Sequence, residues 1–200
     1  MFFAGCLLGY GSLICFAANF NFIIKVYGYT DLEIAINGVL MIVTGTVGAS
    51  LFIIYIKKAL NHKLILGVVC LGSAFMMAIL CLWLNSVNAK AITTFLLIIF
   101  GFVATPIVSI CYDLGCELTF PMGRVILAGI LNCSSLLCAF LLSVFVASVF
   151  GFKNESSSIL IMGFLTIFII FSAIFFMFVK IDLKRRHYKS QQNQATNSPN

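Results

Sequence analysis

Three ionisable side chains gather in one short stretch of an otherwise apolar sequence. Asp113, Glu117 and Arg124 lie within residues 111–124, which read CYDLGCELTFPMGR. The two acids are four residues apart, so they share one face of any helix that continues through both positions. Such charges can form ion pairs that are made and broken as a protein changes shape. We predict that Asp113, Glu117 and Arg124 are gating residues, with a solvated loop of ordinary charges as the alternative.

A second group of polar side chains lies inside long apolar stretches. Asn132 and Ser135 are three residues apart and share a helical face, and Asn19 lies in the second half of the first stretch. Polar groups within a bilayer need partners or a water-lined cavity, and a carboxamide both donates and accepts hydrogen bonds. We predict that Asn132, Ser135 and Asn19 bind substrate, and that Phe16 walls the same pocket. The alternative for the polar residues is a hydrogen bond to a neighbouring helix.

The composition identifies the elements that must position these residues. The chain is 62% hydrophobic and 9% charged, far from the values of soluble proteins. A helix needs about 20 apolar residues to cross a bilayer, and six stretches are long enough. We therefore predict an all-α membrane protein with a six-helix domain over residues 1–180 and a basic, then polar, disordered tail over 181–200. The predicted spans are 2–24, 34–56, 64–84, 91–112, 125–150 and 157–179.

The distribution of basic residues predicts the orientation of the helices. Lys and Arg in short loops are retained on the cytoplasmic side. With the N-terminus inside, nine of them lie on that side, and only Lys25, Lys90 and Lys153 lie on the other. Both termini are then cytoplasmic, in the plasma membrane or an internal membrane. This topology explains the net charge of +6, so the bilayer is an expected partner and nucleic acid is not.

Two further patterns concern helix packing. Gly45 and Gly48 lie in a stripe of small residues with Gly38 in the second span, which is typical of closely packed helices. Pro106 removes a backbone hydrogen bond inside the fourth span and is expected to bend it.

Residues for catalysis or for a cofactor are not grouped in this sequence. There is no nucleophile with a nearby base, no glycine-rich phosphate loop and no pair of carboxylates in a protected pocket. The two histidines are far apart, and the eight cysteines, none in a Cys-x-x-Cys pair, are interpreted as small packing residues. We therefore expect no enzyme, no metal and no cofactor.

With the elements placed, the stretch from 112 to 132 resembles a known family. YDLGCELTFP followed by AGILN is similar to the junction of two helices in the C-terminal half of the feline leukaemia virus subgroup C receptor-related transporters, a branch of the major facilitator superfamily of solute carriers. The family pattern there is approximately FE-x-x-x-E-[IL]-T-[YF]-P, a short spacer and S-x-GLLN. The ending VKIDLKRRH also resembles the last helix and basic exit of that family.

The resemblance implies helices seven to twelve of a twelve-helix transporter that works by alternating access. The substrates of that family are choline and ethanolamine, with haem also proposed. On this interpretation the chain is a C-terminal half or fragment. Its partner is an N-terminal six-helix half or a second copy of the chain.

The sequence departs from the family pattern at several positions, which leaves a second function open. Arg124 and Lys57 stand where the family has acids, and Leu136 stands where it has a substrate-binding glutamine. The family's tyrosine in helix seven has no clean match, since Phe16 or its neighbours stand there. The alternative to transport is a membrane protein that pairs with or regulates a full transporter.

Overall fold

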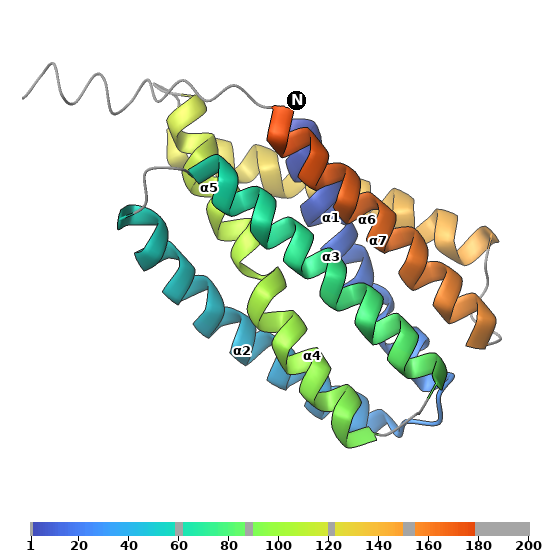
Figure 1. Cartoon of the computed structure of the whole chain (residues 1–200). Helices are drawn as coiled ribbons and strands as arrows, with labels where there is room; N and C mark the ends of the chain where they lie inside the picture. The colour runs from blue at the N-terminus through green and yellow to red at the C-terminus, as the bar shows by residue number, and fades with distance from the viewer. Residues whose placement is uncertain (1, 59–61, 87–89, 120–122, 150–154, 179–200) are drawn as a thin grey trace, which may run out of the picture.

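A computed structural model describes residues 2–58, 62–86, 90–119, 123–149 and 155–178, and every regular element among them is a helix. Six helical spans are long and apolar enough to cross a membrane, which confirms the predicted all-α bundle of six membrane helices. The fourth span consists of two helices, α4 and α5 (Figure 1). The helices are α1 (Phe2–Lys25), α2 (Asp31–Lys58), α3 (His62–Ser86), α4 (Lys90–Ala104), α5 (Pro106–Leu118), α6 (Arg124–Val149) and α7 (Glu155–Phe178).

The ends of the helices follow the limits of the apolar stretches, with one difference. All but one lie within three residues of the predicted limits. The fourth span continues to Leu118, six residues beyond its predicted end at 112. The prediction stopped where acids begin, but a helix can continue beyond the apolar stretch. Asp113 and Glu117 consequently lie on the last turns of α5, and not in a loop.

α1 packs between two neighbouring helices, α6 and α7. α1 packs against α6 and α7, and α3 joins α7 to α4 (Figure 1). α2 packs along α4 and α5 at the edge of the bundle. Two core clusters fill the interior, one containing Phe16 and Phe100 and the other containing Ile110, Leu127 and Phe176.

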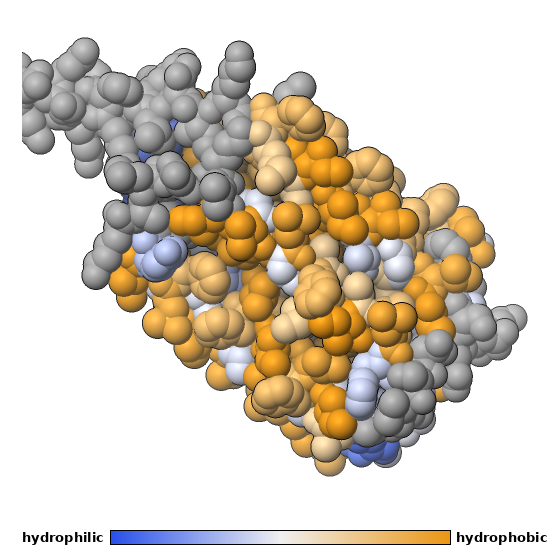
Figure 2. Space-filling view, viewed as in Figure 1, coloured by the Kyte–Doolittle hydropathy of each residue, from blue (hydrophilic) through white to orange (hydrophobic). Residues whose placement is uncertain are grey.

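Large apolar side chains cover the outer surface of the bundle. Figure 2 shows hydrophobic residues over most of the visible face. Along α2 and α6 the exposed side chains include Val39, Ile42, Leu137 and Phe140. A lipid bilayer accepts such side chains without cost, whereas water does not. This surface is as expected for a multi-pass membrane protein.

The fourth span breaks at Thr105, as Pro106 predicts. Pro106 begins α5 and has no N–H for the carbonyl of Phe102, four residues earlier. α2 lies against this break, and Gly48 has no space for a Cβ atom because the carbonyl oxygen of Phe102 occupies it. Gly45 is packed in the same way against the side chain of Thr105. Close packing of the two helices therefore explains these two glycines, while Gly38 of the same stripe has open space around it.

Candidate functional site

Asn132 lies where three helices meet, and it accepts a hydrogen bond from each of two tyrosines. The hydroxyl of Tyr112, on α5, donates to Oδ1 of Asn132 at 2.6 Å. The hydroxyl of Tyr10, on α1, donates to the same oxygen at 3.1 Å. All three side chains are half-buried. We call Tyr10, Tyr112 and Asn132 the tyrosine–asparagine cluster.

The two tyrosine bonds determine what the cluster can still bind. A carboxamide oxygen has two lone pairs, and two phenol hydroxyls occupy both of them here. The amide nitrogen of Asn132 carries two N–H bonds that the two phenol contacts do not use. Each phenol oxygen still has lone pairs that can accept. The cluster can therefore bind a small polar solute through several directed hydrogen bonds and without a charged group.

Tyr10 belongs to a face of α1 that no other helix in the described part of the chain covers completely. Leu7, Tyr10, Ile14, Ala17 and Asn21 follow each other at helical spacing, and none of them is fully buried. We call these five residues the open face of α1. Ala17 and Asn21 are exposed, as are small or polar residues of α2 and α6 such as Thr46, Ser50 and Ser148. The open face of α1 thus combines the exposed carboxamide of Asn21 with the half-buried Tyr10.

Ser135 shares the Asn132 face of α6 but lies in a different environment. Its side chain is fully buried, and its hydroxyl has no hydrogen-bond partner within the described residues. α1 approaches closely here, since a Cβ atom on Gly11 would lie 3.4 Å from the carbonyl oxygen of Ser135. The structure thus places Ser135 inside the contact between α1 and α6, one turn from Asn132.

Asn19 makes a separate polar contact between α1 and α6. Its amide nitrogen donates to the carbonyl oxygen of Cys15 at 2.8 Å and to the hydroxyl of Ser143 at 3.0 Å. Asn19 lies nine residues beyond Tyr10, which corresponds to roughly 13 Å along a helix. The structure does not bring Asn19 into the tyrosine–asparagine cluster, and the bond to α6 agrees with the helix-contact alternative for this residue.

Phe16 is fully enclosed by other aromatic and apolar side chains. Its ring centroid lies 5.7 Å from that of Phe20 and 5.3 Å from that of Phe100, in edge-to-face arrangements. The structure therefore places Phe16 in the core between α1 and α4, apart from Asn132. Its role in binding stays a prediction.

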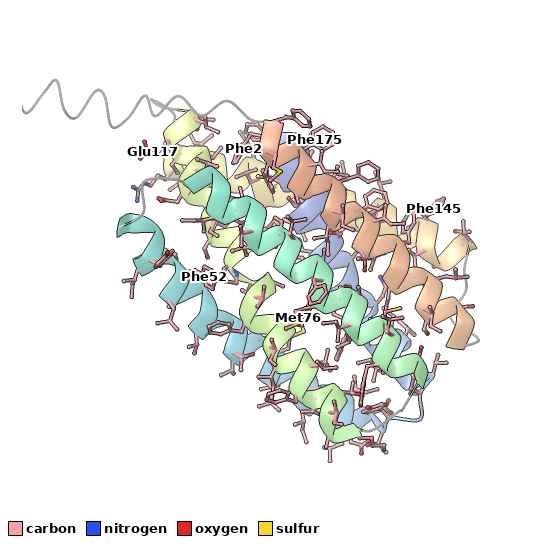
Figure 3. The ribbon with its side chains drawn as sticks, in the orientation of Figure 1. Phe2, Phe52, Met76, Glu117, Phe145 and Phe175 are labelled. Atoms are coloured by element: carbon pink, nitrogen blue, oxygen red, sulfur yellow. The ribbon has the colours of Figure 1, made fainter. Side chains whose placement is uncertain are left out.

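The candidate gating residues lie together at one end of the bundle. Asp113 and Glu117 are half-buried on the last turns of α5, and Figure 3 shows Glu117 at this end. Arg124 is the exposed first residue of α6. Phe120 and Pro121 of the same motif lie outside the described residues. Pairing of the acids with Arg124 or with a partner stays a prediction.

Ion pairs at the opposite end of the bundle connect the end of α1 to the start of α2, and the start of α2 to the start of α4. The Nζ of Lys25 lies 2.8 Å from Oδ1 of Asp31, and the Nζ of Lys90 lies 2.9 Å from Oε1 of Glu33. Glu33 also accepts a bond from the backbone N–H of Thr30, whose hydroxyl caps α2 in return. These contacts join α1 to α2 and α2 to α4. All of these charged groups are partly exposed, so each pair stabilises the fold only slightly.

Sequence reasoning missed Tyr10 and Tyr112. Tyr112 stands directly before Asp113 in the stretch of residues 111–124. A tyrosine inside an apolar helix usually needs a hydrogen-bond partner. That signal was available for both tyrosines, although it does not identify the partner. Among the described residues, no group of three His, Cys, Asp or Glu is placed to hold a metal ion.

Comparison with known proteins does not identify a relative of this chain. No protein-family model matches the chain, and no curated protein matches it. The resemblance to the feline leukaemia virus subgroup C receptor-related transporters therefore stays a prediction that rests on the motif of residues 112–132.

Proposed function

We propose that this chain forms one six-helix half of a solute transporter that works by alternating access. The observation that supports the proposal best is the tyrosine–asparagine cluster, which joins α1, α5 and α6. A polar cluster within membrane helices is costly unless it serves a ligand or a specific contact. This cluster has donors and acceptors left over, and it borders the open face of α1.

The solute that fits is small, organic and polar. The family resemblance suggests choline and ethanolamine as substrates, and haem as a further candidate. The faces of Tyr10 and Tyr112 would attract a quaternary ammonium group by cation–π interaction. A second six-helix unit, either an N-terminal half or another copy of the chain, would cover the open face of α1 and complete the binding site.

Asp113, Glu117 and Arg124 have a gating role in this proposal. They lie at the end of the bundle that the positive-inside pattern assigns to the cytoplasm. Ion pairs between these residues, or with the second unit, would form when the inner mouth closes. A charge reversal at Glu117 would then reduce transport.

Uptake of labelled solute tests the proposed function. Cells that express the chain are compared with cells that carry an empty vector, with choline, ethanolamine and haem as probes. We expect uptake of at least one probe, a loss of about tenfold in Asn132→Ala for the lost site contacts, and no loss in Ser134→Ala. Ser134 is a matched control because its hydroxyl bonds only to carbonyls of its own helix. A membrane-inserted chain that is assembled with a second six-helix unit and still transports none of the three probes would contradict the proposal.

One observation favours the alternative of a protein that pairs with a full transporter. Leu136 is 55% exposed on α6, where the family has a polar substrate contact. An apolar side chain at this position suits contact with another membrane helix better than contact with a polar solute. Co-purification of a full transporter with the chain, together with the absence of uptake by the chain, would establish that alternative.

A further inference from the structure

α2 and α4 are joined by a row of hydrogen bonds that runs along both helices. Three contacts follow one another: Lys90 to Glu33 at 2.9 Å, Thr94 to Asn37 at 2.9 Å, and Thr44 to the carbonyl oxygen of Ile98 at 3.2 Å. The first two pairs have the same separation in sequence, 57 residues. The two helices therefore run parallel in one fixed register, and a shift of either helix would break all three contacts.

Backbone contact between α2 and α4 adds to these hydrogen bonds. Gly101 of α4 has no space for a Cβ atom because the carbonyl oxygen of Met41 occupies it. Gly48 of α2 meets the carbonyl oxygen of Phe102 in the same way. A backbone atom in a packed interior cannot move aside as the tip of a side chain can. α2 and α4 are therefore fixed to each other by groups that do not adapt to a change of position.

α5 is held by contacts of another kind. Gly115 is closely packed, but the atoms nearest to a Cβ atom there are side-chain atoms of Leu127, at 2.9 Å, and of Phe2, at 3.3 Å. Such apolar contacts have no preferred direction, so they persist when a helix turns by a small amount. Tyr112 adds a hydrogen bond to Asn132, which a polar solute can replace. α5 can therefore change its position at a lower cost than α4.

The two halves of the fourth span meet at a break in the helix. α4 ends at Ala104, and α5 begins at Pro106, which has no N–H to donate. The backbone N–H and the hydroxyl of Thr105 both donate to the carbonyl oxygen of Gly101, at 3.2 Å and 2.9 Å. Thr105 is thus tied to α4. A proline is the usual cause of a sharp bend in a long helix, so the span can bend directly after Thr105.

We propose that α5 is a hinged arm, which turns about the Thr105–Pro106 break while α2 and α4 stay together as one unit. The arm carries Tyr112 and, near its end, Asp113 and Glu117. One rotation therefore changes the tyrosine–asparagine cluster and the predicted cytoplasmic gate together. In the proposed transport function, on which this coupling rests, a solute at Asn132 competes for the hydroxyl of Tyr112 and so releases the arm.

Distances between spin labels test the hinge without any assumption about transport. Labels are attached to paired cysteines in a chain whose own cysteines have been replaced, and pulsed electron paramagnetic resonance measures the distances in lipid vesicles. Ile36→Cys with Phe95→Cys reports on α2 and α4, since both positions are exposed. Leu51→Cys with Leu118→Cys reports on α2 and the end of α5. We expect one narrow distance for the first pair, and a broad or double distribution for the second.

Pro106→Ala separates a hinge from fraying at the end of α5. The restored N–H should close the break, so the distribution between Leu51→Cys and Leu118→Cys should narrow to a single distance. Gly38→Ala, at a position with open space around it, is the control and should leave both distributions unchanged. Equally narrow distributions for the two pairs, or a broad one that Pro106→Ala does not change, would overturn the proposal.

Cross-linking combined with uptake tests the coupling. In the same cysteine-replaced background, an oxidant forms a disulfide that fixes α5 to α6, between Gly115→Cys and Leu127→Cys, or one that fixes α2 to α4, between Asn37→Cys and Thr94→Cys. We expect the α5–α6 link to reduce uptake at least about fivefold, because a blocked conformational step limits turnover. Dithiothreitol should restore uptake, and the α2–α4 link should have no effect.

The outcomes separate the coupling from the transport function. Loss of uptake with both links, or with neither, would refute the coupling. A chain that is assembled with a second six-helix unit and shows no uptake before oxidation would refute the transport function and leave the distance measurements standing.

Discussion

At the scale of single residues, one carboxamide oxygen organises the candidate site. Oδ1 of Asn132 accepts from Tyr112 and from Tyr10, so a single atom connects α6 to α5 and to α1. In a membrane interior there is little water to replace a lost partner. Removal of Asn132 therefore leaves two phenol hydroxyls to find new acceptors, and removal of one tyrosine leaves the other bond in place.

We expect the bond between Tyr112 and Asn132 to be measurable by a double-mutant cycle. Tyr112→Phe should lower the free energy of unfolding by about 0.5–1 kcal/mol, the usual range for hydrogen bonds between membrane helices. Asn132→Ala should cost more, because both tyrosines lose their acceptor. The double variant should be no less stable than Asn132→Ala alone, since the bond is already lost. Thermal unfolding in detergent measures these values, and strictly additive losses would show that Tyr112 and Asn132 do not interact.

The sequence predicted part of this site. Asn132 and Ser135 were identified because polar side chains are rare at that depth in a membrane helix. Their different environments were not predictable, because the contact with Gly11 that encloses Ser135 depends on how closely α1 approaches α6. Tyr10 was missed because it is separated from Asn132 by 122 residues, and helical periodicity carries no information on such contacts.

At the scale of helices, the break in the fourth span and the glycines of α2 form one feature. Pro106 leaves the carbonyl of Phe102 without its helical partner, and this carbonyl lies against Gly48. Only a residue without a Cβ atom fits there, because the α2 backbone comes close enough for its Cα–H to contact the oxygen. The bend and the helix crossing therefore depend on each other.

Substitution of Gly48 tests this dependence. Gly48→Ala should destabilise the fold by about 1–3 kcal/mol, because the added methyl group meets backbone that cannot move aside easily. Gly38→Ala, in the same helix but with open space around it, is the matched control. It should be neutral or slightly stabilising because alanine favours helix. Equal effects of the two changes on the melting temperature would contradict the close contact.

Substitution of Pro106 tests the function of the break. Pro106→Ala restores an N–H that can bond the Phe102 carbonyl, so the fourth span should straighten and its contact with Gly48 of α2 should change. Uptake should fall, because α5 carries Tyr112 and would move relative to Asn132. Melting temperature and uptake are measured on the same preparations. Unchanged uptake in a stable variant would show that the bend has no part in the site.

The elements were largely predictable because membrane helices require long apolar stretches. Hydropathy located all six spans, and the proline located the break. The helix of the fourth span continues six residues beyond the predicted apolar stretch, because hydropathy reports the edge of the apolar region and not the end of the helix. A helix that passes this edge keeps its backbone bonds, so Asp113 and Glu117 extend it without cost.

At the scale of the whole molecule, the exposed surface includes the outer sides of α2 and α6 and the open face of α1. α2 and α6 present large apolar side chains such as Val39 and Leu137, which suit lipid. The open face of α1 presents Ala17 and Asn21 next to the half-buried Tyr10. The sequence predicted six membrane helices. It did not predict which face of α1 remains open, because that depends on where α6 and α7 pack around it.

The proposed transport function requires that the open face of α1 border an aqueous solute pathway. The most direct test is the reaction rate of a charged, membrane-impermeant thiol reagent with a single cysteine, introduced into a chain whose own cysteines have been replaced. Ala17→Cys lies near the middle of α1, and Phe75→Cys, 67% exposed near the middle of α3, is the lipid-facing control. We predict that Ala17→Cys reacts at least about ten times faster, because lipid excludes the reagent and suppresses the thiolate. Equally slow reaction at both positions would contradict the claim.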